Sequence, residues 1–168
     1  MHEQLLTLGA ELGATLKVRN YKLALAESCT GGMATQYITA IAGSSVWLDR
    51  SFVTYSNAAK VDMLIVKPAT IEKFGAVSVQ TACEMAQGAL ANSEATITAS
   101  ITGIAGPDGG SVEKPVGMVC FAICTNFTST SPHTLSKTQH FMGSREEIRM
   151  QSVKFIFQQL LISASAQV

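Results

Sequence analysis

Apolar and polar positions along the chain repeat in two different periods, one typical of helices and the other of strands. Near the start, leucines recur at helical spacing, at positions Leu5, Leu8, Leu12 and Leu16. This spacing predicts an amphipathic helix. The short apolar stretch YKLALAE (21–27) follows and predicts a buried strand. GGMATQYITAIAG (31–43) then predicts a second helix, closed by Gly43.

The middle of the chain continues this alternation. SFVTY (51–55) has the alternating pattern of a strand, and the segment 56–66 predicts a helix with Ser56 or Asn57 as its N-cap. Residues 78–93 are rich in alanine and methionine, which predicts a helix capped by Ser78. ATITASIT (95–102) is a β-branched strand that leads into a glycine-rich loop.

The last third predicts two strands and one long helix. GMVCFAICTN (117–126) and TLSKTQHFM (134–142) are strand-like, and the short polar linker 127–133 favours an antiparallel hairpin between them. Ser144 and Glu147 match a helix capping box. The helix that they begin carries an apolar stripe at Ile148, Val153, Ile156, Leu160 and Leu161.

This order of elements predicts the fold class. Strands that alternate with helices and end in a hairpin indicate an α/β protein, a three-layer α/β/α sandwich with a mixed, mainly parallel sheet. No repeat or low-complexity segment divides the chain, so residues 1–168 are expected to form one domain. A chain of this length buries roughly two-thirds of its unfolded surface, enough for one sizeable core.

Composition narrows the classes of function. The chain has 12 basic and 12 acidic residues and no basic stripe, which disfavours binding to a nucleic-acid backbone. No apolar run is long enough to span a membrane, and the N-terminal segment lacks the basic region of a signal peptide. The four cysteines form no C-x-x-C pair, so we expect reduced thiols, a cytoplasmic location and no metal site.

The stretch LALAESCTGG places two possible nucleophiles, Ser28 and Cys29, at a turn between a strand and a helix. Ligands of open α/β sheets bind beyond the carboxyl ends of strands. The main-chain N–H groups of Thr30, Gly31 and Gly32 would be free there to stabilise an oxyanion. A plain helix cap by Ser28 or Thr30 explains the same pattern equally well.

A serine nucleophile needs a base, and no histidine of the chain has a motif-like setting. Lys60 falls one helical turn after Ser56 and can act as a base where burial lowers its pKa. The hydroxyl of Tyr55 could relay a proton or orient this lysine. Two alternatives stay open at this point: Ser56 paired with Lys60, and Cys29 as the nucleophile.

Two further features predict a binding site for an anion. TGIAGPDGG (102–110) is a glycine-rich loop directly after a strand, and its N–H groups could hold a phosphate, although it matches neither a Walker loop nor a dinucleotide fingerprint. Arg145 lies in the first turn of the last helix, where a cation opposes the helix dipole. Phosphate binding and a plain surface position are about equally good accounts of this arginine.

Six segments in a fixed order carry a resemblance to a known family: AESCTGG, GSS, FVTYSNAAK, GAVS, TGIAGPDGG and KPVG. The chain resembles the CinA carboxy-terminal family from about Leu5 to the last helix, and is similar to its stand-alone form. The resemblance implies a bacterial enzyme that hydrolyses the carboxamide of nicotinamide mononucleotide to nicotinic acid mononucleotide and ammonia, without a cofactor or a metal. This reaction would return a by-product of NAD consumption to NAD synthesis.

The resemblance also implies roles for individual residues. The family pattern places the nucleophile on Ser28, and the assisting lysine and tyrosine on Lys60 and Tyr55. The implied substrate-binding residues are Thr30, Gly31, Gly32, Ser44, Asn57, Thr102, Gly103, Gly106 and Arg145. The resemblance further implies a homo-oligomer, a dimer or larger. Two alternatives remain: a non-catalytic nucleotide-binding protein of the same fold, and an amidase of another small amide.

Overall fold

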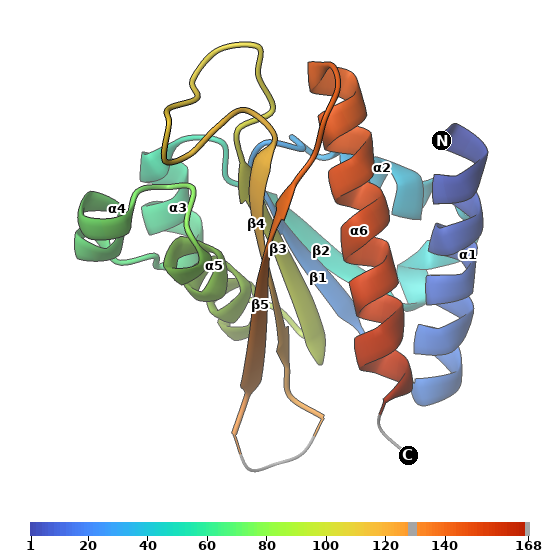
Figure 1. The fold of residues 1–168 in the computed structure, drawn as a ribbon. Helices are drawn as coiled ribbons and strands as arrows, with labels where there is room; N and C mark the ends of the chain where they lie inside the picture. The colour runs from blue at the N-terminus through green and yellow to red at the C-terminus, as the bar shows by residue number, and fades with distance from the viewer. Residues whose placement is uncertain (128–130, 167–168) are drawn as a thin grey trace.

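A computed structural model describes residues 1–127 and 131–166, and its centre is one five-stranded sheet (Figure 1). The strand order is β2 (Leu48–Val53), β1 (Leu23–Glu27), β3 (Ile97–Gly103), β4 (Met118–Thr125) and β5 (His133–His140). β1 pairs in parallel with both β2 and β3, whereas β4 is antiparallel to β3 and to β5. The sheet is therefore mixed, as predicted, with β4 alone opposing the direction of the other four strands.

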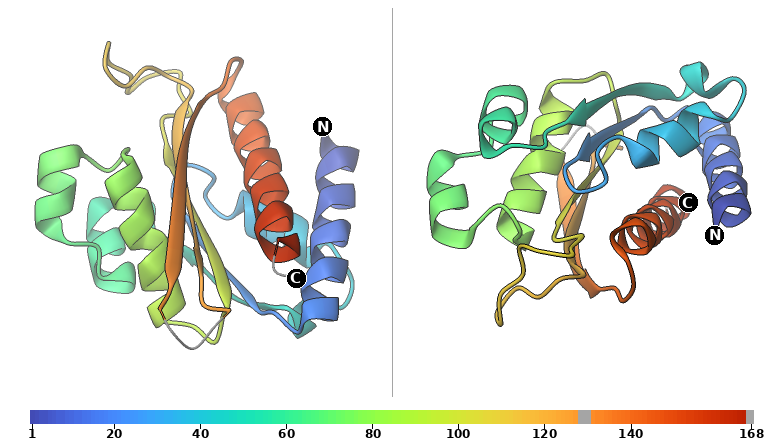
Figure 2. Two further views of the ribbon diagram at one scale, coloured as in Figure 1. Left: turned by 60° about the horizontal axis from the view of Figure 1, so that its bottom comes forward. Right: turned by 90° about the horizontal axis from the view of Figure 1, so that it is seen from above.

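Helices cover both faces of this sheet and make the predicted three layers (Figures 1 and 2). One layer contains α1 (His2–Arg19), α2 (Met33–Thr39) and α6 (Arg145–Ser165), and the other contains α3 (Asn57–Leu64), α4 (Pro68–Phe74) and α5 (Val79–Ala91). All residues of β1 are buried, because both of its faces are covered. The larger apolar cluster lies under α1 and α6 and includes Leu12, Phe121 and Phe157.

The helix caps explain where several elements begin. Ser56 Oγ accepts a hydrogen bond from the N–H of Ala59, so Ser56, and not Asn57, caps α3. Ser78 caps α5 as predicted, and Ser144 and Glu147 form the predicted capping box of α6. The antiparallel hairpin of β4 and β5 is also confirmed, although residues 128–130 of its linker lie outside the described residues.

Two predicted element boundaries are wrong, and one helix was not predicted. α2 ends at Thr39 and not near Gly43; that glycine adopts φ 79° before a short 3₁₀ helix, η1 (Ser44–Val46). β2 begins at Leu48, three residues earlier than expected. The helix α4 was not expected at all. Within the part of the chain that the structure describes, no helix is both long and apolar enough to cross a membrane.

The close approach of α3 to α5 depends on Gly88. A Cβ atom at this position would lie 1.9 Å from the carbonyl oxygen of Leu64, at the end of α3. Only glycine permits this distance between the two backbones. α3 therefore packs directly on α5, in a position that brings Lys60 over the carboxyl end of β1.

Candidate active site

Ser28 follows the last residue of β1 and begins the turn that leads into α2. Its N–H donates to the carbonyl oxygen of Ile101 in β3 at 2.9 Å, which fixes the serine backbone to the neighbouring strand. The turn then reverses through Gly31 and Gly32, with φ values of 58° and 95° that favour glycine. The Ser28 side chain is 8% exposed and lines a cavity beyond the carboxyl ends of β1 and β3.

Lys60 reaches this serine from α3. Its Nζ atom lies 3.0 Å from Oγ of Ser28 and donates to the carbonyl oxygen of Thr54 at 2.9 Å. The predicted pairing of these two residues across 32 positions of sequence is therefore present as a direct contact. The alternative dyad with Ser56 has no such contact, because the Ser56 hydroxyl serves as the cap of α3.

The environment of Lys60 favours its neutral form. The residue is 1% exposed, and in the described part of the chain no carboxylate forms an ion pair with it. Burial therefore lowers the pKa of the Lys60 amine below its ordinary value of 10.5. A neutral amine 3.0 Å from a hydroxyl can accept its proton, which is the task of a general base.

Cys29 is poorly suited to be the nucleophile, although it adjoins Ser28. Its thiol is buried among the core residues, and burial raises the pKa of this thiol to about 12. A thiol acts as a nucleophile in its thiolate form, which is scarce at neutral pH when the pKa is this high.

We therefore expect a Cys29→Ala variant to keep its activity within about threefold of the parent, because Cys29 fills space and carries no charge in the reaction. Steady-state kinetics of the purified variant against the parent measure this. A loss of two orders of magnitude with an unchanged melting temperature would assign the nucleophile to Cys29.

The N-terminus of α2 is capped by a buried carboxylate that was not among the predicted site residues. Glu27 is fully buried and accepts hydrogen bonds from the N–H groups of Gly32, Ala34 and Thr35 at 2.9–3.1 Å. The hydroxyl of Thr35 donates to the same carboxylate at 2.7 Å. Its signal in the sequence was an acidic residue at the end of a strand whose other positions are apolar.

These bonds correct the expected set of oxyanion donors. The N–H of Gly32 is occupied by Glu27, and the N–H of Gly31 donates to the carbonyl oxygen of Ser28 at 3.0 Å. The N–H of Thr30 has no acceptor among the described residues, but Thr30 is fully buried and does not line the cavity. Arg149 of α6, also missed from the sequence, donates to the carbonyl oxygen of Thr30 at 2.7 Å and holds the turn from the other side.

Exposed polar side chains form the rim of the cavity, which has a volume of ≈ 280 Å³. Tyr55 is 61% exposed, and its hydroxyl accepts a hydrogen bond from Nη2 of Arg145 at 2.9 Å. Arg145 also donates to the carbonyl oxygen of Gly106 at 2.7 Å. The structure thus pairs Tyr55 with Arg145, while Lys60 is oriented by the carbonyl group of Thr54.

Most of the remaining predicted residues lie around the same cavity. Asn57, Thr102, Gly103 and Gly106 all contribute to its lining. Ser44 does not: it lies in η1, before the start of β2 and thus at the opposite end of the sheet from Ser28. Its prediction followed from the GSS segment. Thr30, Gly31 and Gly32 shape the turn behind Ser28 but do not line the cavity.

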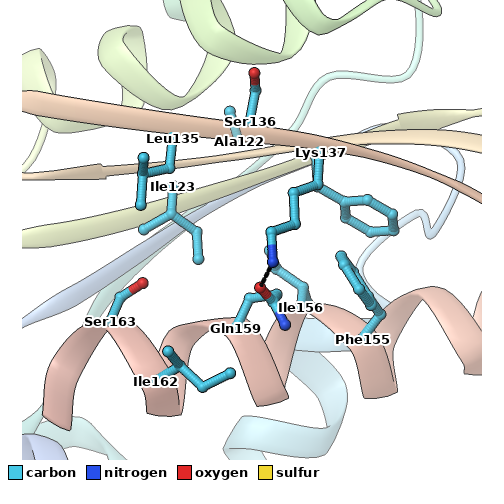
Figure 3. Close-up of a pocket in the computed structure, with 11 residues that line it drawn as sticks. Ala122, Ile123, Leu135, Ser136, Lys137, Phe155, Ile156, Gln159, Ile162 and Ser163 are labelled. Carbon is cyan, nitrogen blue, oxygen red and sulfur yellow. Dashed lines mark hydrogen bonds between the residues drawn. The ribbon is translucent and has the colours of Figure 1, made fainter. Parts of the chain in front are cut away.

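A second cavity, between β5 and α6, has a different character (Figure 3). Its walls are mainly apolar, with Ile123, Leu135 and Ile162 from the sheet and the helix. The Lys137 amine points toward Gln159 and donates to its side-chain oxygen at 2.7 Å. Ser136 and Ser163 also line this cavity, but the described residues show no hydrogen bond from Lys137 to either serine, so the serine–lysine contact of the Ser28 site is not repeated here.

Fold and site together define an α/β protein that holds a buried serine–lysine pair in a polar pocket at the carboxyl ends of its parallel strands. The model of the CinA C-terminal domain matches residues 6–163, and the chain belongs to this family.

Its relatives include the nicotinamide-nucleotide amidohydrolase PncC of Enterobacter agglomerans, 49% identical over 92% of both chains. The protein of the same name from Escherichia coli K12 is 45% identical and covers 94% of this chain and 93% of its own. Among solved structures, the competence/damage inducible protein CihA from Agrobacterium tumefaciens is similar, with a TM-score of 0.90 and 41% identity over 96% of this chain and 95% of its own.

Proposed function

We propose that this protein is a nicotinamide mononucleotide amidohydrolase that forms nicotinic acid mononucleotide and ammonia. The observation that carries the proposal is the 3.0 Å contact between the buried Lys60 amine and the Ser28 hydroxyl, inside a pocket with an arginine on its rim. The identity of the substrate is inferred from the names of relatives that match the chain over nine tenths of their length.

In the first step, Lys60 accepts the hydroxyl proton of Ser28 while the serine oxygen attacks the carboxamide carbon of the substrate. The lysine can do this in its neutral form, which burial favours by lowering its pKa, and the Thr54 carbonyl group holds its amine in place. The carbonyl oxygen of the substrate gains negative charge, which main-chain N–H donors next to Ser28 in the cavity wall stabilise.

The tetrahedral intermediate then collapses and releases ammonia. Lys60 returns its proton to the leaving nitrogen, and the nicotinoyl group stays on the serine oxygen as an ester. A water molecule, deprotonated by the same lysine, hydrolyses this ester and regenerates the free serine. Arg145 on the rim is the proposed partner of the substrate phosphate.

The lowered pKa of Lys60 sets the expected pH dependence. The protonated lysine is inactive as a base, so kcat/KM rises with pH through the pKa of the free enzyme and then levels off. Since burial lowers this pKa, the rise falls at a pH below 10.5. A rate profile from pH 6 to 10.5 measures this. A midpoint at or above the ordinary value would exclude a desolvated lysine as the base.

Ammonia release from nicotinamide mononucleotide tests the proposal directly. The parent should release ammonia, whereas Ser28→Ala and the conservative Ser28→Cys should release far less. Free nicotinamide, which lacks the ribose phosphate, serves as the competing substrate. Equal turnover of both would indicate an amidase of another small amide, and binding of the nucleotide without turnover by the parent would indicate the non-catalytic alternative.

We further propose a place for this reaction in the recycling of NAD, since its product retains the ribose phosphate needed for resynthesis. The other expectations from the sequence stay predictions: a cytoplasmic homo-oligomer with no nucleic-acid or membrane partner.

A further inference from the structure

The charged groups of the Ser28 pocket include one carboxylate that the proposed mechanism does not use. Three residues with a basic or acidic side chain line the cavity: Lys60, Asp108 and Arg145. Lys60 is buried beside Ser28, while Asp108 and Arg145 are exposed at the rim. Because burial lowers the pKa of Lys60 and favours its neutral form, the rim supplies the fixed charges that an entering ligand meets.

Asp108 and Arg145 share the cavity but do not pair with each other. Within the described residues the one ion pair joins Arg50 to Asp49, and the side chain of Asp108 makes no hydrogen bond. Arg145 instead donates to the neutral oxygens of Tyr55 and Gly106. The pocket therefore presents a positive and a negative charge that the protein leaves uncompensated. Such an arrangement is complementary to a ligand that carries both signs of charge.

The loop that carries Asp108 is anchored on both sides of this residue, at Gly106 and at Lys114, and places Asp108 in the lining of the cavity. Before it, the carbonyl oxygen of Gly106 accepts the bond from Arg145. After it, the amine of Lys114 donates to the carbonyl oxygen of Phe74 in α4. Gly106 itself packs so closely that a Cβ atom there would lie 2.5 Å from the Val116 side chain. The loop joins the end of β3 to the start of β4 at the top of the sheet in Figure 1.

We propose that Asp108 is a specificity-determining residue that selects the positively charged, oxidised pyridine ring of the nucleotide over its neutral, reduced form. This inference rests on the proposed function. With the carboxamide at Ser28 and the phosphate at Arg145, the ring and its ribose lie across the cavity that Asp108 borders. A carboxylate near a pyridinium nitrogen stabilises it electrostatically, and at a solvent-exposed rim this changes affinity by about tenfold.

The test compares the binding of oxidised and reduced nicotinamide mononucleotide, which share the ribose and the phosphate and differ in ring charge. Calorimetry in a Ser28→Ala background gives both dissociation constants without turnover. Asp108 also repels the phosphate of either ligand, and taking the ratio of the two constants cancels this contribution. The ratio therefore isolates the effect of the ring charge.

We expect the Ser28→Ala protein to bind the oxidised form about tenfold more tightly than the reduced form. Adding Asp108→Asn should bring the two dissociation constants to within about threefold of each other. Asp108→Glu in the same background should keep part of the preference for the oxidised form. Glu113→Gln is the matched control, because Glu113 is exposed on the same loop but does not line the cavity.

Two outcomes overturn the inference. One is a background protein without a preference for the oxidised ring, and the other is a preference that survives Asp108→Asn. The failure of the proposed function is seen separately, as an absence of ammonia release by the parent. If the parent releases ammonia but Asp108→Asn leaves the ratio of the two dissociation constants unchanged, the protein is an amidohydrolase whose selection of the oxidised ring does not depend on Asp108.

Discussion

Replacing Lys60 by methionine lowers kcat/KM by on the order of 10²–10⁴. The substitution keeps most of the volume of the side chain but removes the only basic nitrogen in contact with the Ser28 hydroxyl in the described structure. Without that nitrogen the serine loses its proton acceptor, and no second base touches Oγ within the same residues. Initial rates of ammonia release for parent and variant measure the loss, with Lys73→Met, an exposed lysine of α4, as the control.

The same variant should be more stable than the parent. A loss of activity in a variant that is more stable results from the missing base and not from unfolding. Lys60 is 1% exposed without a carboxylate partner, so its charged form is costly in the folded state. Its pKa is lower in the folded than in the unfolded chain, so between these two values the unfolded chain binds more protons. Stability of the parent therefore rises with pH across this window, up to about 10.5.

The methionine variant should lack this rise and should melt at a higher temperature than the parent at pH 7. Thermal unfolding at pH 7 and urea denaturation at several pH values measure the two differences. The titration of Cys120 and Cys124 cancels between the two proteins, whereas Cys29 interacts electrostatically with Lys60. A variant that melts below the parent, or that retains activity within tenfold, would contradict the assignment of Lys60 as a desolvated base.

The fold was predictable because its strands and most of its helices have strong local signals. β1 and β3 are continuous apolar or β-branched runs, and the caps Ser56, Ser78 and Ser144 mark helix starts. α4 was not predicted because it has seven residues, too few to show a helical period, although Pro68 stands at its first turn. A short helix of this kind owes its structure to tertiary contacts, such as the bonds from Lys67 and Thr70 to Glu84.

The candidate site was predictable in its residues but not in its contacts. Ser28 had a local signal at the end of a strand, and Lys60 had one in the helix after Ser56. Their distance depends on the packing of α3 against α5 through Gly88, which no local pattern reveals. Ser44 shows the opposite case: a short matching segment suggested a substrate contact, and the topology places it at the far end of the sheet.

The expected oxyanion donors illustrate why the rest could not be derived locally. The N-terminus of a helix has free N–H groups as a rule, which predicted free N–H groups at Thr30, Gly31 and Gly32. In the folded chain, the carboxylate of Glu27 occupies the N–H of Gly32, because the strand buries this side chain directly beneath the first turn of α2. A buried acid in this position therefore defines which N–H groups of the turn stay free.

Replacing Glu27 by glutamine should accordingly destabilise the protein by about 2–4 kcal/mol and lower its turnover. The carboxylate accepts four hydrogen bonds, three from main-chain N–H groups and one from the Thr35 hydroxyl. A glutamine of the same shape loses the negative charge and turns an NH₂ group toward donors, so at least one buried N–H is left without an acceptor. Thermal unfolding should show a melting temperature lowered by roughly 5–15 °C.

The loss of turnover should appear mainly in kcat, because the turn between Ser28 and α2 carries the serine nucleophile. Glu84→Gln is the matched control: Glu84 caps α4 through the N–H of Lys67 and the Thr70 hydroxyl, but it is partly exposed and lies outside the pocket. If Glu27 had only a structural role, the two glutamine variants would show equal kcat at a temperature where both are folded. A reduced kcat in Glu27→Gln alone would show that this carboxylate positions the serine for attack.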